Sequence, residues 1–237
     1  MRTSYRKWTE HPYPGEETPP KGSPGAGYWP MFFITRGRNN DFLDPFRQRI
    51  QWKIKNPNDI DWEIELLLVE QTLQSLTPYQ IRLAKYWGTA EATKRMTPMI
   101  FNFIEKYRLG TPNTARVLGY FHAAINDVCV ITWFLKYRWD VARPNQYERN
   151  LPTVLSTPRF PAYPSAHATI MGCAEILLSY FFPPESTRIK KVMEEGAQSR
   201  LFAGVHFKVD NDEGLRLGRQ IGELVVNLLR IQNLNNH

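Results

Sequence analysis

The chain has 237 residues, 42% of them hydrophobic, which is enough for one substantial buried core or at most two small ones. Its formal net charge is +7, but the basic residues are spread along the chain and form no single block. This distribution argues against nucleic acid as a partner.

We expect a cytoplasmic protein that does not span a membrane. The most apolar stretches, residues 176–182 and 224–229, are far below the roughly 18 residues that a membrane-spanning helix needs. The N-terminal segment is polar and proline-rich, without the apolar part of a secretory signal. Cys129 and Cys173 lack the close cysteine and histidine spacing of zinc sites, and their apolar helical context predicts buried, reduced packing residues.

The predicted organisation is an extended N-terminal arm, residues 1–43, followed by a single helical-bundle catalytic domain, residues 44–237. Proline and glycine are dense between residues 12 and 30, which forbids a regular helix and favours an arm lying on the domain. Aromatic side chains are expected to anchor this arm by burial, and they are Trp8, Tyr13, Tyr28 and Trp29.

Hydrophobic periodicity after the arm predicts an all-α fold, a helical bundle with almost no strand. A first helix is expected over residues 59–76, and new helices where threonine precedes proline, at Thr77-Pro78 and Thr111-Pro112. The longest pattern runs to Arg143, because the proline that follows disfavours helical backbone at the residue before it. Further helices are expected from Pro164 to about Phe182, from about Ser186, and from about Asp210 to Leu234.

Lys136 and Arg143 form the first pattern that indicates chemistry. They are seven residues apart, which is about two helical turns, so both side chains are expected on one face near the end of the long helix. Taken alone, the pair also suits a solvated basic face, where cations interact favourably with the helix dipole.

The second pattern is Pro164-Ser165-Ala166-His167, where proline opens a predicted helix. The free N–H groups of a helix start bind anions, and the Ser165 hydroxyl and the N–H of Ala166 are such donors. His167 lies close enough to exchange a proton with a bound anion. On its own, the segment also suits an ordinary helix cap.

The third pattern is Ser199-Arg200, followed by His206 and Asp210. At a spacing of four residues, Asp210 can hold one nitrogen of the His206 imidazole and orient the other, as for a nucleophile or a metal ligand. Arg200 lies in an apolar context that penalises an unpaired charge, so an anion is expected beside it. The three patterns in this order are far rarer by chance than any one of them.

Together the motifs resemble the superfamily of type-2 phosphatidic acid phosphatases, bacterial class A acid phosphatases and vanadium-dependent haloperoxidases. The superfamily pattern is Lys, six residues, Arg-Pro; then Pro-Ser-Gly-His; then Ser-Arg, five residues, His, three residues, Asp. The chain is similar over residues 123–227, and the resemblance implies the superfamily's helical bundle. One departure is Ala166 in place of glycine, but alanine keeps the N–H and a helix start needs no positive φ.

The resemblance also implies a role for each matched residue. The oxyanion clamp consists of Lys136, Arg143 and Arg200, with Ser165 and the amide of Ala166 as further donors. His206 is the nucleophile on phosphorus, or the ligand of vanadium in bound vanadate, and Asp210 orients it. His167 is the general acid and base at the opposite apical oxygen.

The sequence leaves two reactions open. Phe160 resembles the aromatic wall of chloroperoxidase-type sites, which favours a haloperoxidase with vanadate as cofactor and peroxide and halide as substrates. The chain is short for a haloperoxidase, which favours a soluble phosphomonoesterase that needs no cofactor and acts through a phosphohistidine. A non-catalytic phosphate-binding module is a third hypothesis, although pure binding needs neither histidine. The oligomeric state and the particular halide or phosphoester stay open.

Overall fold

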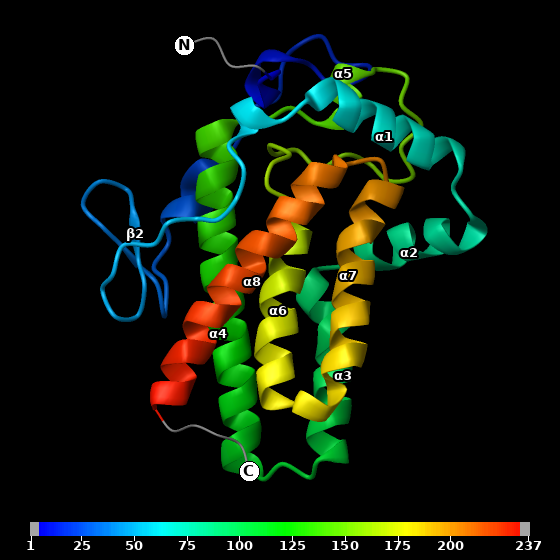
Figure 1. Cartoon of the computed structure of the whole chain (residues 1–237). Helices are drawn as coiled ribbons and strands as arrows, with labels where there is room; N and C mark the ends of the chain where they lie inside the picture. Colours follow the sequence, from blue (N-terminus) through cyan, green and yellow to red (C-terminus); the bar gives the residue numbers. More distant parts are fainter. Residues whose placement is uncertain (1–4, 233–237) are drawn as a thin grey trace.

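The computed structural model describes residues 5–232, and helices dominate it. The N-terminal part holds only short elements, η1 (Trp8–Glu10), η2 (Pro24–Tyr28), the antiparallel strands β1 (Thr35–Arg36) and β2 (Phe42–Leu43), and η3 (Pro57–Asp59). The helices that follow are α1 (Trp62–Gln74), α2 (Pro78–Gly88), α3 (Ala92–Lys106), α4 (Thr111–Trp139), α5 (Pro144–Tyr147), α6 (Ala166–Phe181), η4 (Pro183–Glu185), α7 (Ser186–Phe202) and α8 (Lys208–Ile231). The predicted all-α bundle is therefore confirmed (Figure 1).

Helix α6 lies at the centre of the bundle and packs against α8, α7 and α4. Its contact with α8 is unusually close because glycines of α8 face its backbone. A Cβ added at Gly218 would lie 2.0 Å from the carbonyl oxygen of Thr169, and one at Gly214 would lie 2.7 Å from that of Ser165. The same approach lets the N–H of Ser165 donate to the carbonyl of Asp210 at 2.9 Å. The start of α6 is thereby fixed beside the start of α8.

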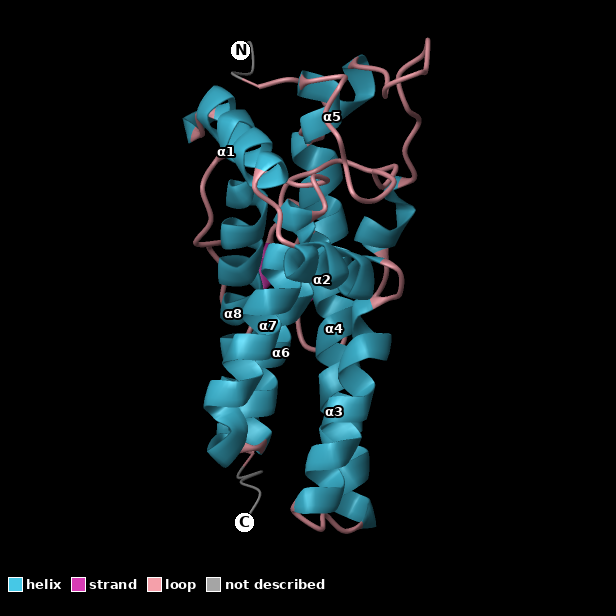
Figure 2. Ribbon diagram, turned by 90° about the vertical axis from the view of Figure 1, so that its right-hand side faces the viewer, coloured by secondary structure: helices cyan, strands magenta, loops and turns pink. Residues whose placement is uncertain are grey.

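Helix α2 crosses the bundle and packs against α7, while α1 and α5 lie over one end (Figures 1 and 2). The predicted start of α2 at Thr77-Pro78 is confirmed, because the Thr77 side chain accepts a hydrogen bond from the N–H of Gln80 and Gln80 bonds back to the N–H of Thr77. The C-terminal turn of α2, residues 85–88, lies near the end of α7, where a Cβ added at Gly88 would be 2.8 Å from Nη1 of Arg200.

Several predicted helix ends differ from the structure. Helix α4 ends at Trp139, not Arg143, because Asp140 adopts left-handed backbone with φ of 57° and its N–H closes the helix on the carbonyl of Lys136. Arg143 instead precedes α5. Helix α6 begins at Ala166, not Pro164, because Ser165 is extended and its hydroxyl accepts from the N–H of Ala168. Helix α1 begins at Trp62 and not at Asp59, and α8 begins at Lys208 and not at Asp210. The residue that precedes α4 is Gly110 and not Thr111. The predicted end of the last helix, Leu234, lies outside the described residues.

The N-terminal arm lies along α4, but only part of its predicted aromatic anchoring is correct. Trp8 and Tyr13 are buried, whereas Tyr28 and Trp29 are each 61% exposed. The arm is held there by its backbone, because the buried Asp127 carboxylate of α4 accepts hydrogen bonds from three consecutive arm N–H groups, those of residues 32–34, at 2.7 to 3.0 Å. Since the backbone is the attachment, the neighbouring rings need not be buried.

Two further expectations need correction. Among the described residues, α4 is long and apolar enough to cross a membrane, with a mean hydropathy of 1.3 in its most apolar window. The expectation that no segment reaches this length is wrong. More than half of that window, 56%, is buried inside the protein, and buried core helices meet the same criterion, so length and composition alone do not make α4 a membrane span. Both cysteines are free, but Cys129 is exposed and only Cys173 is buried.

Candidate active site

The predicted site residues come from separate elements that meet at one end of the bundle, beneath α1 and α5 (Figure 1). Lys136 lies in the last turn of α4, and Arg143 directly precedes α5. Ser165, Ala166 and His167 form the start of α6, Arg200 lies in the last turn of α7, and His206 and Asp210 flank the start of α8. The two cations of the first motif do not share a helical face, because α4 has already ended before Arg143.

His206 is held in one orientation and one protonation state. Its Nδ1 lies 2.8 Å from Oδ2 of Asp210, an oxygen that also accepts the N–H of Phe207 at 3.0 Å. Its Nε2 lies 2.8 Å from Nη1 of Arg143. Because a guanidinium only donates, Nε2 must accept, and the ring proton must lie on Nδ1. The spacing of four residues thus produces an imidazole with a lone pair on Nε2.

Burial and charge keep this imidazole neutral. Burial lowers the pKa of His206 well below its usual value, and the charges of Arg143 and Lys136 lower it further. Burial also raises the pKa of Asp210 to about 7, against the opposing charges of Lys136 and Arg143. A neutral His206 is the form that can donate its lone pair to phosphorus or vanadium.

Lys136 and Arg143 are fully buried and largely engaged with backbone carbonyls. The Lys136 ammonium donates to the carbonyls of Pro161 and Ala162 at 2.7 and 2.6 Å, and burial lowers its pKa well below the usual value. Arg143 donates through Nε to the carbonyl of Phe160 and through Nη1 to that of Val205. Within residues 5–232, its Nη2 has no hydrogen-bond partner.

Arg200 and His167 are the least satisfied groups of the site. Arg200 is 3% exposed, and neither its Nε nor its Nη1 has a partner among the described residues. Burial lowers its pKa to about 10, so the guanidinium stays charged at neutral pH. The Nε2 of His167 also has no described partner, and burial, followed by the charge of Arg200, lowers the pKa of His167 to about 3.

The start of α6 adds neutral donors. Ser165 is buried, and its hydroxyl accepts the N–H of Ala168 at 3.4 Å, which leaves the hydroxyl proton for a further acceptor. Ala166 is the first helical residue and has no positive φ, as expected for a position where alanine replaces glycine. Helix starts of this kind present unpaired N–H groups to anions.

Phe160 lies against the cations of the site. The centre of its half-buried ring is 4.9 Å from Cζ of Arg143, 5.3 Å from Nζ of Lys136, and 4.7 Å from the ring of Trp133. The position suits an aromatic wall. It also means that Phe160 and the clamp are in direct contact, so they cannot be treated as independent.

Gln146 is a site residue that the sequence analysis missed. Its Oε1 accepts the N–H of Arg143 at 2.8 Å, and its Nε2 donates to the carbonyls of Trp8 and His11 in the arm. The arm is therefore tied to the backbone that carries Arg143. A signal was present, because proline at the first helical position followed by glutamine at the third is typical of a capped helix start.

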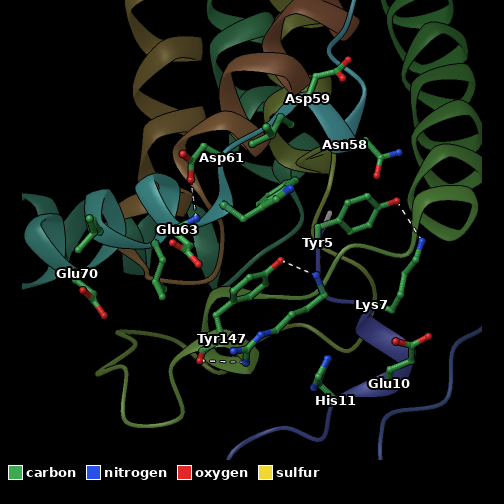
Figure 3. A pocket seen from close by; sticks show the side chains of 15 residues that line it. Tyr5, Lys7, Glu10, His11, Asn58, Asp59, Asp61, Glu63, Glu70 and Tyr147 are labelled. Carbon is green, nitrogen blue, oxygen red and sulfur yellow. Dashed lines mark hydrogen bonds between the residues drawn. The ribbon is translucent and has the colours of Figure 1, made fainter. Parts of the chain in front are cut away.

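A large cleft lies elsewhere and has a volume of about 1420 Å³ (Figure 3). It opens between the arm, η3, α1 and Tyr147, and none of the predicted site residues lines it. Two of its lining residues, Trp62 and Tyr147, pack edge-on against Phe207, with ring centres 5.1 and 5.3 Å away. An aromatic layer thus separates this cleft from His206.

The unpaired N–H groups indicate which kind of ligand the site can bind. Burying an arginine without a partner for its N–H groups costs several kcal/mol in general. In the described part of the chain, three guanidinium N–H positions and one imidazole nitrogen remain without partners. They belong to Arg143, Arg200 and His167, which all lie near enough to His206 to lower its pKa. A tetrahedral oxyanion offers several acceptor oxygens around one central atom, so phosphate and vanadate both match this donor set.

Comparisons with known proteins find the same fold in solved structures. Residues 182–233 match the family model of the second helical-bundle domain of VCPO. The fold is similar to that of a bacterial vanadium-dependent iodoperoxidase (TM-score 0.72, 20% identity, 96% of this chain and 62% of that chain). It is also similar to that of a holo-type bacterial vanadium-dependent chloroperoxidase (TM-score 0.69, 15% identity, 87% of this chain and 54% of that chain). The chain thus spans less than two thirds of those proteins.

The fold is also similar, though less closely, to that of a membrane protein. It is a transmembrane PAP2-type phosphatidylglycerolphosphate phosphatase from Bacillus subtilis, with a TM-score of 0.54 and 16% identity over 71% of this chain and 86% of that chain. No curated protein sequence matches the chain.

Proposed function

We propose that the chain is a member of the superfamily of vanadium haloperoxidases and type-2 phosphatidic acid phosphatases and that it is a vanadate-dependent haloperoxidase. The observation that carries the proposal is that Arg143 and Arg200 have unpaired buried N–H groups and lie near His206, whose Nε2 carries a lone pair. The haloperoxidase branch is favoured because the matched family model describes a haloperoxidase domain. The fold is also closer to the two haloperoxidases than to the PAP2 phosphatase.

Each residue then has a defined task. Arg143 and Arg200 would direct their unpaired N–H groups to the oxygens of a bound vanadate, and Lys136 would add positive charge. Arg143 must release Nε2 of His206, so that this nitrogen can bond to the central atom. Asp210 holds the Nδ1 proton throughout. Vanadate, when bound, supplies the centre at which hydrogen peroxide is activated to oxidise halide.

We assign His167 to proton transfer at the bound anion. In the structure its Nε2 is unpaired and its pKa is about 3, so the ring is neutral at neutral pH. A bound anion favours the protonated imidazole and raises this pKa. His167 can therefore accept a proton from peroxide and return it to the departing oxygen.

A phosphatase is the second candidate, because the same donors match phosphate as well as vanadate. In that reaction, Nε2 of His206 attacks phosphorus, the bond to the leaving alkoxide breaks, and His167 gives that alkoxide a proton. Water, deprotonated by His167, then cleaves the phosphohistidine. A non-catalytic phosphate-binding module is less well supported, since binding alone needs neither the tautomer fixed on His206 nor the unpaired His167.

Two assays on the purified protein separate these candidates. Halogenation of an organic acceptor is measured with vanadate, peroxide and iodide, bromide or chloride, and p-nitrophenyl phosphate hydrolysis is measured without vanadate. We expect halogenation that depends on vanadate and is lost in His206→Ala. Hydrolysis without halogenation would replace the haloperoxidase with the phosphatase. Vanadate binding with neither activity would support the binding module.

A further inference from the structure

The C-terminal turn of α2 lies outside all three motifs, yet it touches two of the least satisfied groups in the site. The backbone of Trp87 is hydrogen-bonded to His167. The next residue, Gly88, is the last of α2 and lies against the guanidinium of Arg200, so that an added Cβ would be 2.8 Å from its Nη1. Because α2 packs on α7, which carries Arg200, this turn is held against the site by the fold.

The contact with Trp87 determines which nitrogen of His167 is free. Trp87 lies in the last turn of α2, where its carbonyl has no N–H donor within the helix and needs a donor from outside. The bond raises the pKa of His167, as expected when an imidazole N–H donates to a carbonyl. Because Nε2 has no partner among the described residues, the donor is Nδ1. The lone pair of Nε2 is thus left to accept a proton, either from peroxide or from a protonated oxygen of the bound anion.

The absence of a side chain at Gly88 determines where Arg200 lies. A Cβ there would lie 2.1 Å from Cδ1 of Leu155 in addition to its contact with Arg200. Real Cβ atoms do not approach heavy atoms so closely, so an alanine at this position forces both neighbours to move. Arg200 is buried, with Nε and Nη1 unpaired, and a shift of its planar fork would misdirect those N–H groups.

We propose that the Trp87-Gly88 turn positions the site for its oxyanion. Trp87 holds His167 in the Nδ1–H tautomer, and Gly88 provides the space that sets the Arg200 guanidinium. Both residues act through a neighbour and do not touch the reacting atoms themselves. The inference rests on the proposed function insofar as the anion must bind between Arg200 and His167.

Calorimetric titration with orthovanadate and with inorganic phosphate tests the role of Gly88. We expect Gly88→Ala to weaken both affinities about tenfold to a hundredfold, the effect of misdirecting hydrogen bonds to a charged group. The matched control is Gly119→Ala, a helical glycine around which an added Cβ meets nothing within 4 Å, and its affinities should equal those of wild type. Thermal unfolding confirms that each variant is folded.

Two further variants separate Arg200 from Leu155. Leu155→Ala removes one of the two clashes, so Gly88→Ala/Leu155→Ala should fold well and still bind weakly. In an Arg200→Ala background, adding Gly88→Ala should change the affinity no further. Recovery in the Leu155 double variant, or an undiminished effect without Arg200, would overturn the role of Gly88. Wild-type protein that binds neither anion would instead overturn the proposed function.

Nitrogen NMR of the full-length wild-type protein tests Trp87 without any change in the turn. Long-range proton–nitrogen correlations report the tautomer of each of the five histidines, and His167→Gln identifies the relevant signal. We expect a neutral ring with its proton on Nδ1 at neutral pH. A proton on Nε2, or an equal mixture of tautomers, would show that the Trp87 carbonyl does not orient His167.

Discussion

Replacement of Arg200 by methionine should stabilise the anion-free protein while abolishing anion binding. Arg200 is 3% exposed, and two of its nitrogens have no described partner. Burial lowers its pKa from 12.5 to about 10, which corresponds to about 3 kcal/mol of unfavourable charge burial at about 1.4 kcal/mol per pH unit. Methionine keeps much of the packing without the charge, so we expect the free energy of unfolding to rise by about 1–3 kcal/mol.

Urea unfolding of wild type, Arg200→Met and Arg143→Met measures this directly. Arg143→Met is the contrasting variant, because it removes the hydrogen bonds to the carbonyls of Phe160 and Val205 and to the ring of His206. We expect this variant to be less stable than wild type by about 3 kcal/mol. Phosphate at 100 times its Kd should then stabilise wild type by about 2.7 kcal/mol and Arg200→Met by almost nothing. An anion-free Arg200→Met protein less stable than wild type would refute the reasoning.

The difference in stability between Arg200→Met and wild type should depend on pH in a defined direction. Below about pH 10, Arg200 is charged in both the folded and the unfolded chain, so the advantage of Arg200→Met should be constant across neutral pH. Above about pH 10, folded wild type releases the proton while the unfolded chain still holds it. Wild type then gains stability as pH rises, and the advantage of the variant shrinks.

Four other outcomes can be measured. Asp210→Asn should lower turnover by about tenfold to a hundredfold, because the His206 ring loses the carboxylate that fixes its tautomer, and a near-normal rate would exclude that role. Phosphate affinity should increase as pH falls from 7 to 5, since the complex takes up a proton on His167, whose pKa is about 3 without the anion, and titrations of His167→Gln should show a smaller increase. Phe160→Ala should weaken vanadate binding about twofold to tenfold and also lower bromide oxidation, because the ring faces two clamp cations; an unchanged affinity would exclude that contact. Asp127→Ala should lower the free energy of unfolding by about 2–4 kcal/mol, as three arm N–H groups lose their acceptor, and fluorescence-monitored denaturation checks this.

Sequence spacing predicted the relations between neighbouring residues at helix starts well. The four-residue separation of His206 and Asp210 predicted an oriented imidazole, and the structure has that hydrogen bond at 2.8 Å. Thr77 before proline predicted the start of α2 for the same reason, since a cap depends only on its neighbours. The bundle followed from apolar periodicity.

Relations that depend on the path of the backbone between elements were not readable from spacing. Arg143 was placed on the face of Lys136, but the left-handed Asp140 ends α4 first, and the two cations meet through tertiary packing. Tyr28 and Trp29 were expected to be buried, although the buried carboxylate of Asp127 holds that segment by its backbone. The turn at Trp87-Gly88 gave no signal at all, because only the packing of α2 on α7 brings it to the site.

A crystal structure of the protein with orthovanadate tests the central claim most directly, because anomalous scattering locates vanadium independently of the surrounding density. The account predicts one vanadium atom within bonding distance of Nε2 of His206, with Arg143 Nη2 and Arg200 Nη1 turned to its oxygens. A fully folded protein that binds vanadium away from His206, or leaves Arg200 without an oxyanion contact at saturating vanadate, would contradict it.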